Sequence, residues 1–290
     1  MSDYKIITDS TSDLSVELIA EMDVHVIPMH FTVDGKDYVN YPDERGLSAR
    51  KFYDMLRAGK EASTSLLNAE YFKEQVRPFL DEGLDILYLC FSSALSASYN
   101  SVLMAKPELE EEYPGRKVII VDTLAASLGE GLIVYHAVQR KKEGLSLEDV
   151  AKWTEENKLR IAHWFTVDDL HHLKRGGRLS GAAAMVGTML NIKPVLHVDS
   201  EGRLMPVDKI RSRKKSLEAL VTRMENMAID PQNQTIFICH GDVLEDAKYV
   251  EKLVRERMNV KNIYINDIGP VIGAHAGPGT VALFFYANER

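Results

Sequence analysis

The sequence predicts an α/β protein of two domains, the first built on a parallel doubly wound sheet. Short apolar runs alternate with helical patterns from Tyr4 to about residue 140, which is typical of strands and helices wound around a parallel sheet. The chain has 290 residues, 45% of them hydrophobic, which is more than most single cores contain. A new strand pattern starts near residue 160. We therefore expect an N-terminal α/β domain over 1–160 and a C-terminal α/β domain with a mixed sheet over 161–290.

The first domain reads as strands that are each followed by a polar segment and a helix. Ile86–Phe91 is almost unbroken in its apolar character, as expected for a strand covered on both faces. The expected strands are Tyr4–Thr8, Val24–Val33 with a hairpin turn at Asp34-Gly35, Leu84–Phe91 and Val118–Val121. The expected helices are Leu14–Met22, capped by Ser12 or Asp13, then Ser48–Leu56, Glu70–Leu80, one after Ser92, Leu128–Arg140 and Leu145–Asn157. Two glycines in the fifth helix, Gly129 and Gly131, cost about 1 kcal/mol each and indicate close packing there.

Hydroxyl side chains follow three of these strands, after Thr8, Phe91 and Val121, and a further cluster spans Ser63–Ser65. Ligands of doubly wound sheets bind at the carboxyl ends of the strands, where the first three clusters are expected to lie. Hydroxyls at a helix N-terminus can hold a carboxylate or a phosphate. They can equally be simple N-caps. The pattern alone leaves both interpretations open.

The second domain begins with a strand over Leu159–Val167, a short helix over Asp168–Leu173 and a basic glycine turn at Lys174–Arg178. Ser180 caps a charge-free helix, Gly181–Leu190, whose apolar residues on every side indicate burial or contact with an apolar cavity. The remaining expected elements are a hairpin (Pro194–Val198 and Arg203–Ile210), helices Ser212–Met227 and Leu244–Met258, and strands Thr235–His240, Ile263–Asp267 and Thr280–Tyr286, with a glycine-rich loop from Ile268 to Gly279.

Charge and composition exclude several classes of function. The formal net charge is −8 at pH 7, and the only dense basic run is Lys209–Lys215, so we expect no nucleic-acid binding. No window approaches 18 uninterrupted apolar residues, and the N-terminus lacks signal-peptide features, which predicts a cytoplasmic protein without a membrane span. Cys90 and Cys239 lie in apolar runs and are expected to be core residues. The nine histidines are scattered, so we expect neither a metal nor another cofactor.

Four stretches together resemble the bacterial DegV family, the fatty-acid-binding subunits that present acyl chains to a separate fatty acid kinase. They are Thr8-Asp-Ser-Thr-Ser-Asp-Leu14, Ser92-Ser-Ala-Leu-Ser-Ala-Ser-Tyr99, Asp169-Leu-His-His-Leu-Lys-Arg-Gly-Gly-Arg-Leu-Ser180 and Val271-Ile-Gly-Ala-His-Ala-Gly-Pro-Gly279. The resemblance covers the whole chain. It implies a two-domain DegV-like fold with a long-chain fatty acid buried between the domains as the ligand, and it leaves room for transient contact with a membrane.

The resemblance also implies a set of site residues. Thr64 and Ser65 match the family's Thr-Ser pair, and Ser93 and Ser96 match its serine loop. These four are expected to meet the carboxylate. The polar surround of the headgroup is expected to consist of Arg178, Arg211 and His275. The chain departs from the family pattern at Leu66-Leu67, where Gln-Pro is usual, and at Ala97, which stands where the family has glycine.

An enzyme is the main alternative function. Ser93 or Ser96 with His275 and an aspartate would suit a serine-dependent acyl hydrolase, but neither serine lies in a Gly-x-Ser-x-Gly elbow. Another small-molecule enzyme that uses a nucleotide would need a phosphate-binding loop, and the sequence contains no Gly-x-x-x-x-Gly-Lys-Ser/Thr. We therefore expect the protein to be a lipid-binding subunit and the kinase partner to supply the chemistry.

Overall fold

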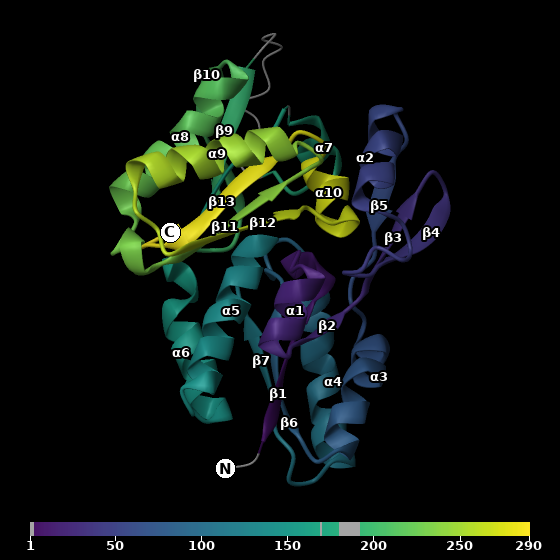
Figure 1. Cartoon of the computed structure of the whole chain (residues 1–290). Coiled ribbons are helices and arrows are strands. Elements are labelled where there is room, and N and C mark those ends of the chain that lie inside the picture. Colours follow the sequence, from purple (N-terminus) through teal and green to yellow (C-terminus); the bar gives the residue numbers. More distant parts are fainter. Residues whose placement is uncertain (1–2, 169, 180–191) are drawn as a thin grey trace.

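The computed structural model describes residues 3–168, 170–179 and 192–290. In the described residues a four-stranded sheet and a six-stranded sheet lie one above the other, and a three-stranded sheet lies to one side (Figure 1). All strands of the four-stranded sheet precede residue 160, and all strands of the six-stranded sheet follow it. This arrangement agrees with the expected fold class. The domain boundary at residue 160 remains a prediction.

The four-stranded sheet is parallel and doubly wound. Its order is β2 (His25–Ile27), β1 (Tyr4–Asp9), β6 (Asp85–Cys90) and β7 (Val118–Asp122). The helices α3 (Ala69–Asp81) and α4 (Ser98–Glu112) cover one face, and α5 (Leu128–Lys142) and α6 (Leu147–Asn157) cover the other (Figure 1). From β1 the chain moves to one side of the sheet to form β2, and it returns to the other side to form β6. The order of the strands therefore reverses between β1 and β6, which creates a crevice beyond their carboxyl ends.

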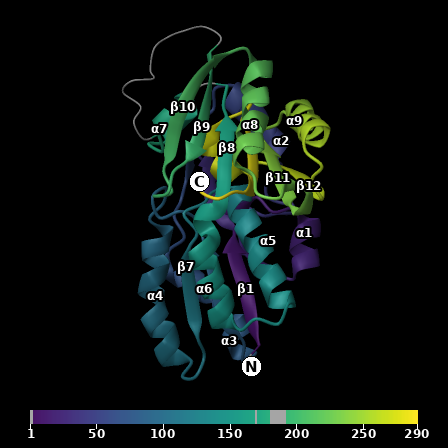
Figure 2. The ribbon, with the colours of Figure 1, turned by 90° about the vertical axis from the view of Figure 1, so that its left-hand side faces the viewer.

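The six-stranded sheet is mixed, as expected. Its order is β10 (Leu204–Arg211), β9 (Ile192–Val198), β8 (Ile161–Thr166), β13 (Val281–Tyr286), β11 (Thr235–His240) and β12 (Asn262–Asp267). Only the pairing of β11 with β12 is parallel among the described strands of this sheet. Two helices pack on its outer face, α8 (Arg213–Met227) and α9 (Leu244–Arg257), as the view in Figure 2 also shows.

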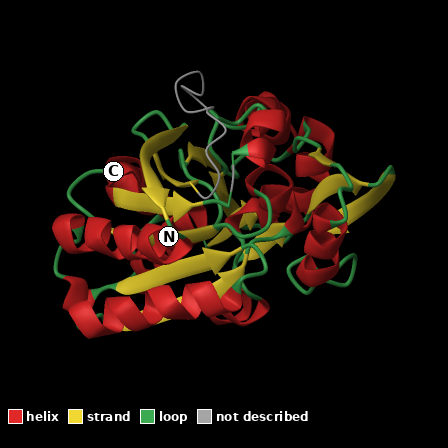
Figure 3. Cartoon of the chain, turned by 90° about the horizontal axis from the view of Figure 1, so that it is seen from above, coloured by secondary structure: helices red, strands yellow, loops and turns green. Residues whose placement is uncertain are grey.

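Side-chain alternation along these strands separates two cores. On β11, Phe237 and Cys239 belong to the core that is shared with the N-terminal sheet, whereas Ile236 and Ile238 belong to the core under α8 and α9. Successive residues of a strand point to opposite faces, so both faces of this sheet are covered. The helix α5 lies between the two sheets, and an added Cβ at Gly129 would meet Phe284 of β13 at 2.8 Å. The expectation of close packing at this glycine is confirmed. In the view from above in Figure 3, the strands lie between layers of helices.

The expected strand Val24–Val33 is divided in two. Proline lacks the N–H that would continue a ladder, and Pro28 separates β2 from β3 (Met29–Val33). The strand β3 joins a small antiparallel sheet with β4 (Lys36–Asn40) and β5 (Ala62–Thr64). The Ser63–Ser65 cluster therefore lies on and after a strand rather than capping a helix, because the N-cap of α3 is Asn68.

Other expected elements need smaller corrections. The helix α1 (Val16–Met22) is capped by Ser15, because Ser10–Ser12 form a 3₁₀ turn of their own, η1. The expected loop from Ile268 to Gly279 contains a helix, α10 (Pro270–Ala276), in which proline occupies the first turn. The other elements are α2 (Ala49–Arg57), α7 (His171–Arg175), η2 (Lys158–Arg160) and η4 (Pro231–Asn233). The expected helix Gly181–Leu190 lies outside the described residues.

Candidate functional site

A cavity lies between the two large sheets, at the crevice beyond β1 and β6. Its volume is about 100 Å³. Most of its wall is apolar. The polar residues that line it among the described residues are Asp9, Thr11, Thr64, Ser65, Ser96, Ser98, Ser127, His163, Arg178, His275 and Thr280. The cavity therefore combines a long apolar surface with a small set of donors and acceptors.

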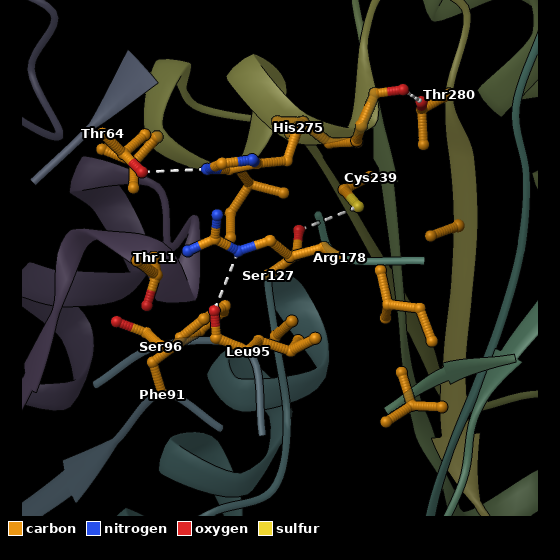
Figure 4. Close-up of a pocket in the computed structure, with 18 of the residues that line it drawn as sticks. Thr11, Thr64, Phe91, Leu95, Ser96, Ser127, Arg178, Cys239, His275 and Thr280 are labelled. Carbon is orange, nitrogen blue, oxygen red and sulfur yellow. Dashed lines mark hydrogen bonds between the residues drawn. The ribbon is translucent and has the colours of Figure 1, made fainter. Parts of the chain in front are cut away.

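Thr64 and His275 meet at this cavity although 211 residues separate them in sequence. Thr64 ends β5 and His275 lies in the last turn of α10, which packs against β5. The Thr64 Oγ1 atom lies 2.9 Å from His275 Nε2 (Figure 4). The other ring nitrogen, Nδ1, is buried and has no hydrogen-bond partner among the described residues.

The His275 ring is neutral near pH 7. Burial, and to a smaller extent the positive charges of Arg178 and Arg175, lower its pKa from 6.5 to about 4. A neutral imidazole has one N–H and one acceptor nitrogen. The ring can therefore donate one hydrogen bond, either to Thr64 or to a ligand.

The serine loop after β6 contributes a pair of hydroxyls. Ser98 Oγ accepts the backbone N–H of Leu67 at 3.0 Å, and Ser96 Oγ accepts the backbone N–H of Ser98 at 3.2 Å. The two Oγ atoms lie 2.9 Å apart. One hydroxyl proton joins the two oxygens, so the other proton is available to a ligand. Ser98 is 2% exposed and was not among the predicted site residues.

Arg178 supplies the positive charge at this part of the wall. Its Nε donates to the carbonyl oxygen of Leu95 at 3.0 Å, and its Nη1 donates to the carbonyl oxygen of Gly176 at 2.6 Å. Figure 4 shows the guanidinium between His275 and Leu95. Burial lowers its pKa, but a guanidinium remains charged in proteins. The site thus places one cation beside the hydroxyls and the imidazole.

The structure brings together five of the seven predicted site residues. Thr64, Ser65, Ser96, Arg178 and His275 all line the cavity, and Ser65 is exposed at its edge. Ser93 is not among the described residues that line it, and its backbone N–H donates to Asp122 Oδ1 at 3.1 Å. Arg211 is exposed at the end of β10 and also lies away from the cavity. Neither residue is among the described residues that line the cavity, and their placement at the headgroup remains a prediction.

Comparisons with known proteins identify the family of the chain. The family model described as "Uncharacterised protein, DegV family" matches residues 3–288. A DegV domain-containing protein of Clostridium perfringens is 44% identical over 290 residues, covering 100% of this chain and 99% of that protein. The chain belongs to the DegV family.

Solved DegV structures share the fold of this DegV chain. A structure described as fatty acid binding of a DegV family protein from Thermus thermophilus has a TM-score of 0.88 and 32% identity, and covers 99% of this chain and 100% of its own. DegV of Bacillus subtilis, described as a fatty acid binding protein, has a TM-score of 0.82 and 28% identity with the same coverage. In the described part of this DegV protein, no helix is long and apolar enough to cross a membrane.

The sequence prediction missed much of the cavity wall of this DegV protein. Phe165, Ala282 and Phe284 line the cavity from the inner face of the six-stranded sheet. Their period of two along β8 and β13 is a signal that the sequence contains, because alternate residues share one face. Ile268, Val271 and Ile272 lie in or beside α10, which we had expected to be a loop.

Three buried carboxyl groups lie in or next to the polar wall in this DegV protein. Asp9, Asp13 and Glu130 are 0%, 6% and 0% exposed. Burial raises the pKa of each, for Asp13 and Glu130 well above the ordinary value. Asp13 accepts hydrogen bonds from Ser127 Oγ at 2.5 Å and from the backbone N–H of Gly269 at 2.9 Å. Through Gly269, Asp13 connects the loop after β1 to the C-terminal half.

Proposed function

We propose that this protein binds a long-chain fatty acid, with the carboxylate near Thr64, Ser96 and His275 and the acyl chain along the apolar wall. The observation that carries the proposal is the cavity itself, whose mostly apolar wall carries a group of hydroxyls together with the His275 imidazole and the Arg178 guanidinium, with the Asp9 carboxyl and the His163 imidazole elsewhere in the wall. Each methylene buried contributes about 0.8 kcal/mol, and charged hydrogen bonds orient the headgroup. The fatty-acid-binding DegV proteins of Thermus thermophilus and Bacillus subtilis support this assignment.

The first test is the content of the purified protein. We expect denaturing extraction followed by mass analysis to recover one long-chain fatty acid per chain, because the buried acyl chain should survive purification. Native mass spectrometry of protein prepared without added lipid should show the same mass increment. Recovery of no fatty acid, together with no binding of added oleate or palmitate, would refute the proposal.

Fatty-acid binding is favoured over ester hydrolysis by the arrangement of the polar residues. The closest hydroxyl partner of Ser96 is Ser98, and the described partner of His275 Nε2 is Thr64. A serine hydrolase needs the serine next to the imidazole and a carboxylate on the other ring nitrogen. Ester hydrolysis or ATP turnover by the pure protein, abolished by Ser96→Ala, would instead support an enzyme.

We propose further that the protein presents the bound carboxylate to a separate fatty acid kinase, which forms the acyl phosphate. Ser65 is exposed beside Thr64, so the polar side of the cavity lies close to the surface. The exposed Arg211 would then serve docking or acyl phosphate handling rather than fatty-acid affinity. We expect Arg211→Ala to leave oleate affinity unchanged and to reduce acyl phosphate formation in a mixture with the kinase. Equal acyl phosphate formation by Arg211→Ala and the unchanged protein would contradict this role.

A further inference from the structure

Glu130 occupies an unusual position for an acidic residue. It lies in the first turn of α5, between the two sheets, and is 0% exposed. The titratable groups that face it are Asp9 and Asp13 from the β1 loop and Cys90 from β6. On β8, His163 packs against the neighbouring Gly129, and burial keeps that imidazole neutral by lowering its pKa. The charged groups that act on Glu130 are thus carboxyl groups, those of Asp9 and Asp13.

The hydroxyl of Thr11 stands between Glu130 and Asp9. Thr11 Oγ1 lies 2.5 Å from Asp9 Oδ1 and 2.9 Å from Glu130 Oε2. A hydroxyl has one proton to donate, and an ionised carboxylate can only accept. Thr11 therefore cannot satisfy two ionised carboxylates. Both contacts become hydrogen bonds when one of the two acids carries a proton and donates it to Thr11 Oγ1.

The remaining contacts decide which acid is protonated. Asp9 accepts the backbone N–H of Thr11 at 2.9 Å and the hydroxyl of Tyr88 at 2.7 Å, besides the hydroxyl of Thr11. These donors stabilise its ionised form. Glu130 has one further contact, from Thr8 Oγ1 to Oε1 at 2.8 Å, and the same hydroxyl also lies 3.0 Å from the carbonyl oxygen of Leu89. Glu130 therefore has fewer hydrogen-bond donors than Asp9 among the described residues, and its ionised form is the less stabilised of the two.

We propose that Glu130 is a neutral carboxylic acid that donates a hydrogen bond to Thr11, which in turn donates one to an ionised Asp9. Because Glu130 carries no charge, the cavity can accept an anionic headgroup. The relay runs from Glu130 Oε2–H to Thr11 Oγ1, and from Thr11 Oγ1–H to Asp9 Oδ1. Asp9 and Thr11 line the cavity, whereas Glu130 lies behind them and acts through Thr11 as a positioning residue. A second negative charge behind Asp9 would oppose a carboxylate beside Arg178.

The choice of ligand rests on the proposed fatty-acid binding and deepens it. Oleate and oleyl alcohol have the same apolar chain and differ in the charge of the headgroup. The contribution of the chain therefore cancels in the ratio of their affinities, and the ratio reports how the charge of the cavity wall acts on the headgroup. At an effective dielectric constant of about 20, two unit charges roughly 10 Å apart interact strongly enough to change a binding constant by on the order of tenfold, so removing an ionised group from this wall should change the ratio by that order. Removing a group that is already neutral should not change it.

The experiment compares Asp9→Asn with Glu130→Gln at pH 7. We expect Asp9→Asn to raise the preference for oleate over oleyl alcohol by on the order of tenfold, since it removes a charge. The conservative Glu130→Gln keeps a neutral donor and acceptor, so its ratio should stay at that of the unchanged protein. A raised ratio in Glu130→Gln, or equal ratios in both variants, would overturn the assignment.

A spectroscopic measurement on the unchanged protein decides the protonation state independently of ligand binding, and a folded variant serves only to assign the resonance. In protein labelled with ¹³C at the glutamate side-chain carboxyl, one resonance should keep the shift of a protonated acid at pH 7 and be absent in Glu130→Gln. If Glu130→Gln does not fold, Thr11→Val assigns the resonance by shifting it. A Glu130 resonance with the shift of an ionised carboxylate at pH 7 refutes the proposal. If neither lipid binds the unchanged protein, the fatty-acid proposal fails, and this resonance still decides the state of Glu130.

Discussion

Replacing Thr64 by valine tests the headgroup site most directly, because valine keeps the shape of the side chain and removes only its hydroxyl. The hydroxyl lies 2.9 Å from His275 Nε2 and faces the cavity. Without it, both nitrogens of the His275 ring lack a described partner, since Nδ1 is already unpartnered. A bound carboxylate would also lose one of its donors.

The expected loss of affinity follows from the cost of an unsatisfied buried group. Leaving a desolvated carboxylate without a donor costs about 1–3 kcal/mol, which corresponds to a roughly 5- to 150-fold weaker binding of oleate. The neighbouring Ser63 provides a matched control. It lies on the same strand, is exposed and does not line the cavity. Ser63→Ala should therefore bind oleate as the unchanged protein does.

The assay is titration of oleate by calorimetry, with the melting temperature of each ligand-free variant measured alongside. A weaker affinity in Thr64→Val with a folded protein would support the site. If Thr64→Val and Ser96→Ala both bind oleate unchanged, the carboxylate does not lie where we place it. If Ser63→Ala weakens binding as much as Thr64→Val, the effect comes from the β5 strand rather than from the hydroxyl.

Three further predictions concern the loop, the packing and the pH dependence. Ser96→Ala should weaken oleate binding by about 1–3 kcal/mol, whereas Ser93→Ala should not, as calorimetry can measure, because only Ser96 lines the cavity. Gly129→Ala should lower the free energy of unfolding in urea by about 1–3 kcal/mol, since the methyl group would meet His163 and Phe284; an unchanged value would contradict the packing. Burial lowers the pKa of His136 from 6.5 to about 4. Between these two values the unfolded chain binds more protons than the folded chain, so the free energy of unfolding falls as the pH drops. The loss from this residue is up to roughly 3 kcal/mol. His136→Phe should lose less stability between pH 6.5 and 4 in the same urea assay, and an identical loss would show that His136 is not the group responsible.

Local patterns were sufficient for most elements of the fold. The unbroken apolar run that ends at Phe91 and the alternation of strands with helices predicted the parallel sheet, because burial on both faces leaves this mark on a strand. The same reasoning failed at Pro28, where one β run belongs to two sheets. It failed again at Pro270–Ala276, because three glycines in and beside that segment suggested a loop while packing against β5 and α7 stabilises a helix.

The sequence predicted which types of residue form the candidate site, but only some of the individual residues. Motif positions identified Thr64, Ser96, Arg178 and His275, which lie together in the structure. Ser98 was overlooked because a serine in the first turn of a helix resembles an ordinary cap. Ser93 was included because it matches the family's serine loop, and it is not among the described residues that line the cavity.

The sequence by itself determined that hydroxyls gather at the carboxyl ends of the strands, because strand order and polarity follow from the local pattern. The composition also indicated more apolar material than a single core needs, and the structure contains two cores, one of them shared between the two large sheets. Only the tertiary structure decided which of these hydroxyls face one cavity. Thr64 and His275 meet because α10 packs against β5, and no periodicity within either segment contains that contact. The same holds for Glu130, whose surroundings at the junction of β1, β6 and α5 depend on groups far apart in the chain.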